Sequence, residues 1–145
     1  MPLTVSEIAE RIAKPGANKA ALIERIRHWT RERLISPRGR RNPGTGRHRV
    51  YDESILEDVL ILNAMADLGL TVGLQRTALV LARHAKGEWR DKASRGVHLF
   101  LEIDTMPNGQ QFPHLHEGTS FNLSADYAIV FNLTRLFAGL NTERE

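Results

Sequence analysis

The chain of 145 residues contains no cysteine. Disulfide frameworks, cysteine-based zinc sites, thiol sensors and cysteine nucleophiles are therefore excluded. No uninterrupted apolar run approaches the roughly 20 residues that a membrane span needs. The first residues also lack a basic segment followed by an apolar one, so we expect neither a membrane partner nor a signal peptide.

Motifs that would indicate catalysis are equally scarce. The chain has no P-loop, no nucleophile elbow and no paired-carboxylate motif. His114 and His116 form a weak candidate metal pair, because a His-x-His spacing puts two imidazoles on one side of a strand. A third ligand is not evident nearby, and we predict a loop at this segment. We therefore expect a protein that is not an enzyme and has no cofactor.

Positive charge is abundant but unevenly distributed. Residues 1–52 hold 12 Lys and Arg against 5 Asp and Glu, a net charge of +7, whereas residues 53–145 hold 8 against 12, a net charge of −4. Nine arginines and a single acid, Glu32, lie between Arg25 and Arg49. Such asymmetry indicates a polyanionic partner. A planar guanidinium suits that partner, because it binds phosphate oxygens or a guanine edge through two hydrogen bonds.

The first third of the chain predicts two helices. Thr4 and Glu7 have the spacing of a capping box and predict a helix over residues 5–13. Asn18 is an N-cap candidate for a second helix that we expect to end near residue 33. Apolar residues recur at helical spacing in both segments, so each helix should bury one face.

A loop and two further helices are expected next. Residues 36–49 are rich in proline, glycine and arginine, and predict a short hairpin with its tip at Pro43 and Gly44. Asp52 is expected to cap the third helix. Thr71 should begin a fourth helix whose end begins at Lys86 and Gly87, and fraying to about residue 92 is an alternative.

The last third changes from helical to alternating patterns. Alternation over 97–103 predicts a strand, and residues 110–118 are polar and predicted irregular. Phe121 and Leu123 indicate a short strand. Residues 127–133 favour a strand followed by a helix from Thr134, although the same stretch also fits a helix. The predicted fold class is α+β, in which an N-terminal winged helix-turn-helix precedes a helix and a small C-terminal antiparallel β-sheet.

Five segments of the N-terminal half match one family. The matching segments are Leu3–Ala9 at the opening helix, Ile26–Trp29 in helix 2, Leu34–Pro37 entering the loop, Arg49–Asp52 leaving it, and Leu68–Thr71 between the next helices. In these features the N-terminal 70 residues resemble the winged-helix DNA-binding domain of the MerR family of bacterial transcription regulators. The chain departs from that pattern at His28, where tyrosine is usual, and at Arg33, where glycine is common. The segment from Ala13 to Ile26 is also several residues longer than the usual helix-turn-helix spacing, so the turn or the recognition helix is extended.

The resemblance implies three parts and two groups of DNA-binding residues. The parts are a DNA-binding domain at 1–70, a linking or dimerisation helix at 71–95 and a small α+β region at 96–145. Helix 2 would lie in the major groove and the loop, as a wing, on the backbone. Tyr51 has an alternative role in packing the wing, and Arg49 in pairing with an acid. The helix candidates are Lys19, Arg25, Arg27, His28 and Arg31, and the wing candidates are Arg38, Arg40, Arg41, Arg47, Arg49 and Tyr51.

These features together predict a transcription regulator that binds double-stranded DNA, most simply as a homodimer in the cytoplasm at the nucleoid. An alternative is an architectural or recombination factor of a mobile element, similar to excisionases. A protein-interaction module without DNA binding is a third hypothesis, against which the density of arginine argues. The C-terminal region resembles no effector domain, so neither an effector nor its signal is predicted.

Overall fold

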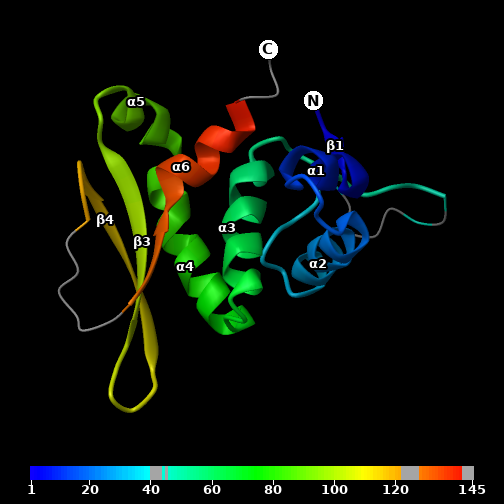
Figure 1. Cartoon of the computed structure of the whole chain (residues 1–145). Helices are drawn as coiled ribbons and strands as arrows, with labels where there is room; N and C mark the ends of the chain where they lie inside the picture. The colour runs from blue at the N-terminus through cyan, green and yellow to red at the C-terminus, as the bar shows by residue number, and fades with distance from the viewer. Residues whose placement is uncertain (40–43, 45, 122–127, 142–145) are drawn as a thin grey trace. The chain divides into compact units, whose positions relative to one another are not determined.

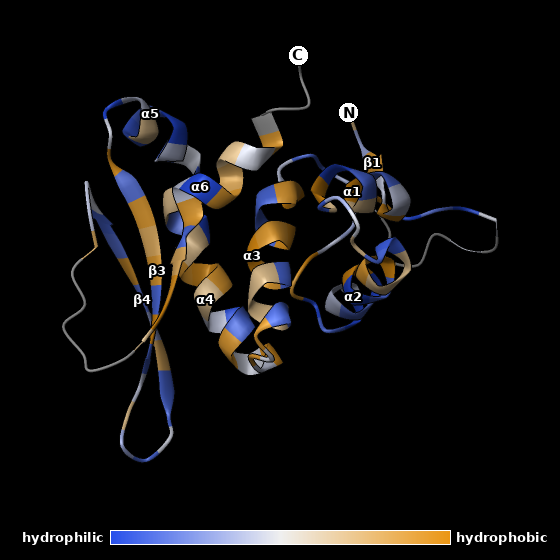
Figure 2. Ribbon diagram, in the orientation of Figure 1, coloured by the Kyte–Doolittle hydropathy of each residue, from blue (hydrophilic) through white to orange (hydrophobic). Residues whose placement is uncertain are grey.

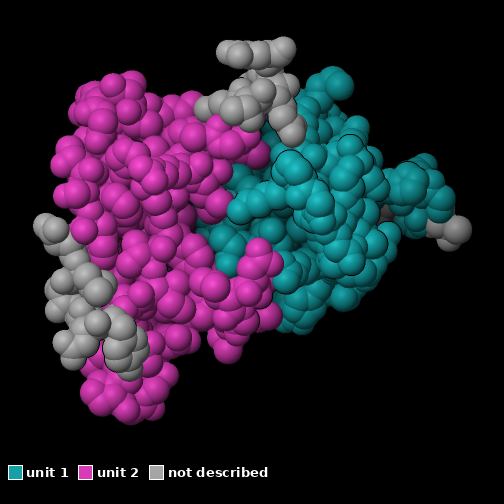
Figure 3. Space-filling model, viewed as in Figure 1, with its two compact units in different colours: residues 1–64 teal, residues 65–145 magenta. Residues whose placement is uncertain are grey.

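The computed structural model of the chain describes residues 1–39, 44, 46–121 and 128–141. The chain divides into two compact units, residues 1–64 and residues 65–145 (Figure 3). The structure is mixed α+β with two small antiparallel sheets, as predicted for the fold class. The functional division at residues 70 and 95 stays a prediction.

The first unit contains two capped helices, as predicted. Helix α1 (Val5–Ile12) begins with the expected capping box, in which the Thr4 amide donates to Glu7 Oε2 at 2.7 Å and the Glu7 amide donates to Thr4 Oγ1 at 3.3 Å. Helix α2 (Lys19–Arg31) begins at Asn18, whose side chain accepts a hydrogen bond from the Ala21 amide. Both caps satisfy amides that have no partner within the helix.

A two-stranded sheet ties the start of the chain to the end of the loop. Strand β1 (Leu3–Thr4) pairs antiparallel with β2 (Val50–Tyr51). This pairing replaces a hairpin within the loop, since the described residues between 36 and 49 form no strand. The predicted tip at Pro43 lies outside the described residues.

Helix α3 (Ile55–Asp67) begins three residues after Asp52, so the predicted cap at Asp52 is wrong. Residues 52–54 form a turn instead, in which the Ile55 amide donates to the backbone oxygen of Asp52 at 3.0 Å. Hydrophobic residues predominate along α3 (Figure 2). The core of the first unit consists mainly of Ile8, Ile26, Trp29, Tyr51, Val59 and Leu62, each at most 1% exposed.

Helices open the second unit. Thr71 caps α4 (Val72–Ala85) as predicted, with its hydroxyl accepting from the Leu74 amide at 3.3 Å. The chain then continues through a 3₁₀ turn, η1 (Lys86–Glu88), into the short helix α5 (Trp89–Ser94). The Trp89 ring packs on Phe137, with 5.5 Å between the ring centroids. The chain after α4, where the sequence leaves fraying as an alternative, is an ordered turn and helix with a buried aromatic side chain.

A three-stranded sheet in the order β4-β3-β5 completes the second unit. Its strands are β3 (His98–Thr105), β4 (Gln111–Gly118) and β5 (Ile129–Asn132), and it is followed by α6 (Leu133–Ala138) and the turn η2 (Gly139–Asn141). The first predicted strand, and the choice of a strand followed by a helix near residue 133, are confirmed. Helices α4 and α6 contact this sheet (Figure 1).

Strand β4 shows that the predicted irregular segment at 110–118 is wrong. Its residues pair in full register with β3, from Gln111 opposite Thr105 to Gly118 opposite His98. The strand was missed because it lies at the sheet edge, where its side chains alternate between exposed and half-buried positions and hydrophobic residues are few. Phe121 lies outside any strand, and Leu123 and Tyr127 lie outside the described residues.

Candidate nucleic-acid interface

One exposed stripe runs along α2. Residues 20, 24, 27 and 31 recur at helical spacing and are all exposed, with half-buried His28 beside them. The opposite side of the same helix is buried through Leu22, Ile26 and Trp29. The packing of these apolar residues therefore orients Arg27 and Arg31 outward. Of the five predicted helix residues, the structure brings together Arg27, His28 and Arg31.

Arg27 makes an ion pair on this stripe. Its Nη1 lies 2.5 Å from Glu24 Oε1, and the two side chains are 52% and 62% exposed. Exposed pairs of this kind contribute about 0.3–0.5 kcal/mol on a helix. A phosphate or a guanine edge could therefore replace Glu24 as the partner of Arg27 at small cost.

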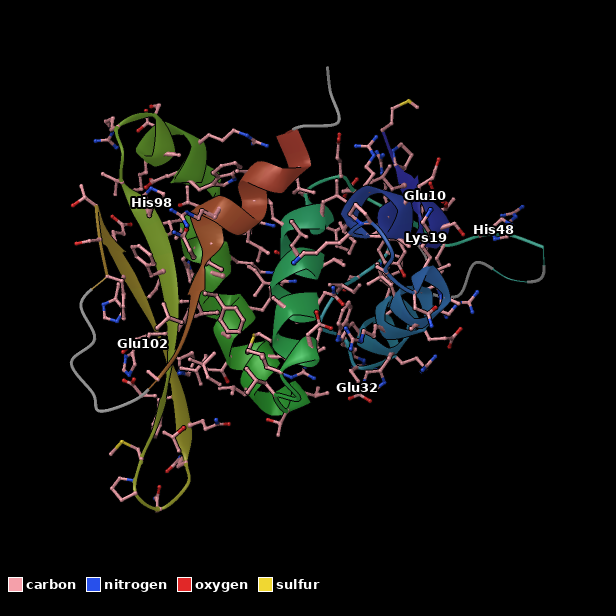
Figure 4. All side chains as sticks on the ribbon, in the orientation of Figure 1. Glu10, Lys19, Glu32, His48, His98 and Glu102 are labelled. Carbon is pink, nitrogen blue, oxygen red and sulfur yellow. The ribbon has the colours of Figure 1, made fainter. Side chains whose placement is uncertain are left out.

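Two other predicted helix residues are directed elsewhere. Arg25 Nη1 donates to Asn63 Oδ1 at 2.7 Å, and this bond joins α2 to α3 in a half-buried position. Lys19 Nζ lies 2.9 Å from Glu10 Oε1 of α1. Both residues are labelled in Figure 4. Arg25 and Lys19 lie about a quarter turn or more from the exposed stripe. Arg25 therefore contributes to the packing of α2 on α3, whereas Lys19 stays at the exposed surface in an ion pair that, like that of Arg27, could be exchanged at small cost.

The arginine-rich loop leaves the body of the unit next to β2. Its base is closed by the Arg38 amide, which donates to the Val50 oxygen at 2.6 Å, and Arg38 Nε lies 3.8 Å from Asp52 Oδ1. Arg47 and His48 are exposed, with His48 out on the loop in Figure 4, while Arg49 is half-buried. The predicted wing residues Arg40 and Arg41 lie outside the described residues.

Tyr51 is not part of the exposed surface. Its side chain is fully buried, and its hydroxyl lies 2.7 Å from Thr30 Oγ1, which in turn donates to the Ile26 oxygen at 2.9 Å. A phosphate cannot reach a hydroxyl in this position, so the burial speaks against the predicted DNA contact and favours the alternative, a packing role for Tyr51. The hydroxyl pair fixes the end of the loop to the middle of α2.

Arg33 is an exposed cation just beyond α2 that the sequence-based set of binding residues omitted. Its backbone is left-handed, with φ +59°, at the position where the resemblance expects glycine. The missing glycine was the signal that could have drawn attention to it. Its guanidinium makes no hydrogen bond or ion pair within the described part of the chain.

The weak metal candidates lie on a strand and not in a loop. His114 and His116 share one face of β4, where His116 Nε2 lies 2.7 Å from Glu102 Oε2 and His114 Nε2 lies 3.2 Å from Asp104 Oδ2. The Glu102 side chain, labelled on β3 in Figure 4, is only 4% exposed. Among the described residues, no group of three or more histidines and carboxylates has the arrangement of a metal site. The imidazoles instead serve as partners of the two carboxylates.

In the described segments, no helix has the length and apolar character needed to cross a membrane. No family model matches the chain, and no curated protein matches it in sequence.

Proposed function

We propose that this protein is a DNA-binding transcription regulator whose first unit works as a winged helix-turn-helix resembling that of the MerR family. The observation that carries the proposal is the exposed stripe of α2, where Arg27, His28 and Arg31 share one face while Trp29 and Ile26 hold the opposite face in the core. A recognition helix needs this division, because one face must pack while the other enters the major groove.

The stripe and the loop would have different tasks. On α2, the exposed guanidinium groups can bind a guanine edge through two hydrogen bonds and so distinguish one sequence from another. In the loop, Arg38, Arg47 and the neighbouring arginines would neutralise backbone phosphates without reading sequence. The first unit has a net charge of +4 and the second a net charge of −1, which supports the first unit as the one that faces the DNA.

A homodimer is part of the proposal, because two-fold symmetry suits the pseudo-palindromic sites that helix-turn-helix regulators bind. The edge of β4 is a poor dimer contact, however. The Met106 amide donates to the Gln110 oxygen, so these two residues form a hydrogen-bonded pair at the end of the β3–β4 ladder. Because hydrogen-bonded and non-hydrogen-bonded pairs alternate along an antiparallel ladder, Ile103 and Pro113 form a non-hydrogen-bonded pair. The Pro113 nitrogen therefore faces outward, away from β3. A proline in the middle of an edge removes a donor and opposes pairing with another strand.

The test is a titration of fluorescent duplex DNA with the full chain over a range of salt concentrations. We expect binding whose affinity falls steeply with salt, because every neutralised phosphate releases counterions. Absent or salt-independent binding would refute the proposal. Light scattering of the free protein tests the dimer, and a monomer at concentrations that saturate the DNA would refute that part.

Selection of bound fragments from the host genome then identifies the sites. A regulator should enrich single sites at promoters, and a location at the nucleoid in the cytoplasm follows from that function. Several phased sites next to a recombinase gene would instead assign the protein to the recombination factors similar to excisionases.

A further inference from the structure

Three helices of this chain end in the same backbone motif. After α2, the amides of residues 33 and 34 donate to the oxygens of residues 30 and 29, at 3.2 and 2.9 Å. After α3, residues 69 and 70 donate to 66 and 65, at 2.9 and 3.2 Å, and after α5, residues 96 and 97 donate to 93 and 92, at 3.0 and 2.9 Å. This pair of bonds defines the Schellman motif, which needs a left-handed residue directly after the C-cap.

The left-handed residue differs among the three motifs. It is glycine after α3 and α5, with φ +71° at Gly69 and +76° at Gly96, but arginine after α2, with φ +59° at Arg33. Arg33 is the only residue other than glycine with a positive φ in the described part of the chain. A side chain in this conformation is strained by its own Cβ, which glycine lacks.

Nothing inside the described structure offsets that strain. The Arg33 side chain is exposed and makes no hydrogen bond or ion pair with a described residue. The hydrogen bond from the residue 33 amide to the oxygen of residue 30 would form equally well with glycine, as the equivalent bonds do at Gly69 and Gly96. Strained backbone that the fold itself does not need is characteristic of functional positions.

We propose that Arg33 anchors a DNA backbone phosphate at the C-terminal end of α2. This inference rests on the proposed DNA binding and adds a contact outside the stripe and the loop. The carbonyl end of a helix carries partial negative charge and repels phosphate, so a cation is needed for DNA to approach there. The two backbone bonds hold the Cα of Arg33 in place, which fixes the point and the direction at which its side chain leaves the backbone. Glu32, the preceding residue, marks this end of α2 in Figure 4.

Replacing Arg33 by glycine separates the two effects of the arginine. Arg33→Gly removes the strain, so we expect the Tm to rise by about 3–5 °C. It also removes the phosphate contact, so we expect the affinity for duplex DNA to fall about tenfold and the slope of log affinity against log salt to decrease by about 0.9. A more stable protein that binds DNA less well cannot be explained by partial unfolding.

Two controls separate the effect of a charge at position 33 from the effect of an arginine in this motif elsewhere. Arg33→Lys keeps the cation and the strain, and should retain the salt slope and most of the affinity. Gly96→Arg places an arginine in the same motif of the second unit, and should lower the Tm while leaving the salt slope unchanged.

The outcomes distinguish this inference from the function on which it rests. If the unaltered chain does not bind duplex DNA, the proposed function fails. If the unaltered chain binds but Arg33→Gly binds with equal affinity and slope, the assignment of Arg33 is overturned. Equal losses in Arg33→Gly and Arg33→Lys, or a changed slope in Gly96→Arg, would overturn it as well.

Discussion

Charged side chains of the two units offer two contrasting kinds of ion pair. In the first unit, arginines stand on an exposed stripe and an exposed loop, and Arg27 has a partner that it can exchange at little cost. In the second unit, charged groups face one another across the sheet, and buried Glu102 bonds to His116 while Lys92 of α5 pairs with Glu117 of β4. Arg27 thus keeps an exposed pair that is readily exchanged, whereas Glu102 and Lys92 are held in pairs that support the fold of the second unit.

The largest expected effect tests internal pairing in the second unit. His116→Ala leaves the Glu102 carboxylate buried without the imidazole that bonds to it, whose Nε2 lies 2.7 Å from Glu102 Oε2, so we expect a loss of about 3 kcal/mol in the free energy of unfolding. Urea denaturation measures it. The matched control is His114→Ala, which should cost about 1 kcal/mol or less because Asp104 is more exposed. Equal losses in the two variants would show that the burial of Glu102 is not decisive.

The second prediction tests exposed charge in the first unit. Arg27→Ala should weaken binding to a specific DNA site by about 1–3 kcal/mol, because one base or phosphate contact is lost. Arg95→Ala is the matched control, since Arg95, the C-cap residue of α5, is also an exposed arginine that pairs with an acid one turn earlier, Asp91 at 2.9 Å. It should leave the affinity unchanged. If both variants bind alike in a fluorescence titration, the stripe of α2 is not the interface.

Helices and sheet edge also differ in how well the sequence predicts them. Capping residues and apolar spacing act locally, so Thr4, Asn18 and Thr71 are recognised without knowledge of the fold. Strand β4 has no such local signal, because the long-range pairing with β3 makes it a strand. The fold of the helices is therefore predictable and that of the sheet edge is not.

The candidate site is likewise only partly predictable from local sequence signals. The charge pattern identifies the basic segment, but the direction of each side chain depends on tertiary contacts. Arg25 is directed inward by Asn63, which lies 38 residues away, and Tyr51 by Thr30. The sequence marks Arg33 only as a departure from the expected glycine, and its left-handed backbone is seen in the structure. Composition thus predicts the partner class, whereas the set of contacting residues requires the structure.

A smaller effect tests whether Tyr51 belongs to the fold or to the interface. Tyr51→Phe removes the hydroxyl that pairs with Thr30 but keeps the buried ring, so we expect a loss of about 1 kcal/mol in the free energy of unfolding. The affinity for DNA at a temperature where the variant is fully folded should not change. A weaker affinity with unchanged stability would return Tyr51 to the DNA-binding residues.

The smallest effects are differences in pH dependence between the units. Hydrogen bonds from the Thr4 amide and hydroxyl lower the pKa of Glu7 below its usual value near 4.5, so Glu7 stabilises the first unit above that pH, and this contribution is lost as the pH falls through the lowered pKa. Hydrogen bonds to Glu117 and Glu88 raise the pKa of Lys92 above its usual value near 10.5, so Lys92 stabilises the second unit below that pH, and this contribution is lost as the pH rises through the raised pKa. Glu7→Gln should therefore differ from the unaltered chain in its free energy of unfolding at neutral pH, with the difference shrinking in acid. Lys92→Met should differ at neutral pH, with the difference shrinking only in strong base. If both differences shrink at the same end of the pH range, the ionised side chains do not act in the two units as their hydrogen bonds indicate.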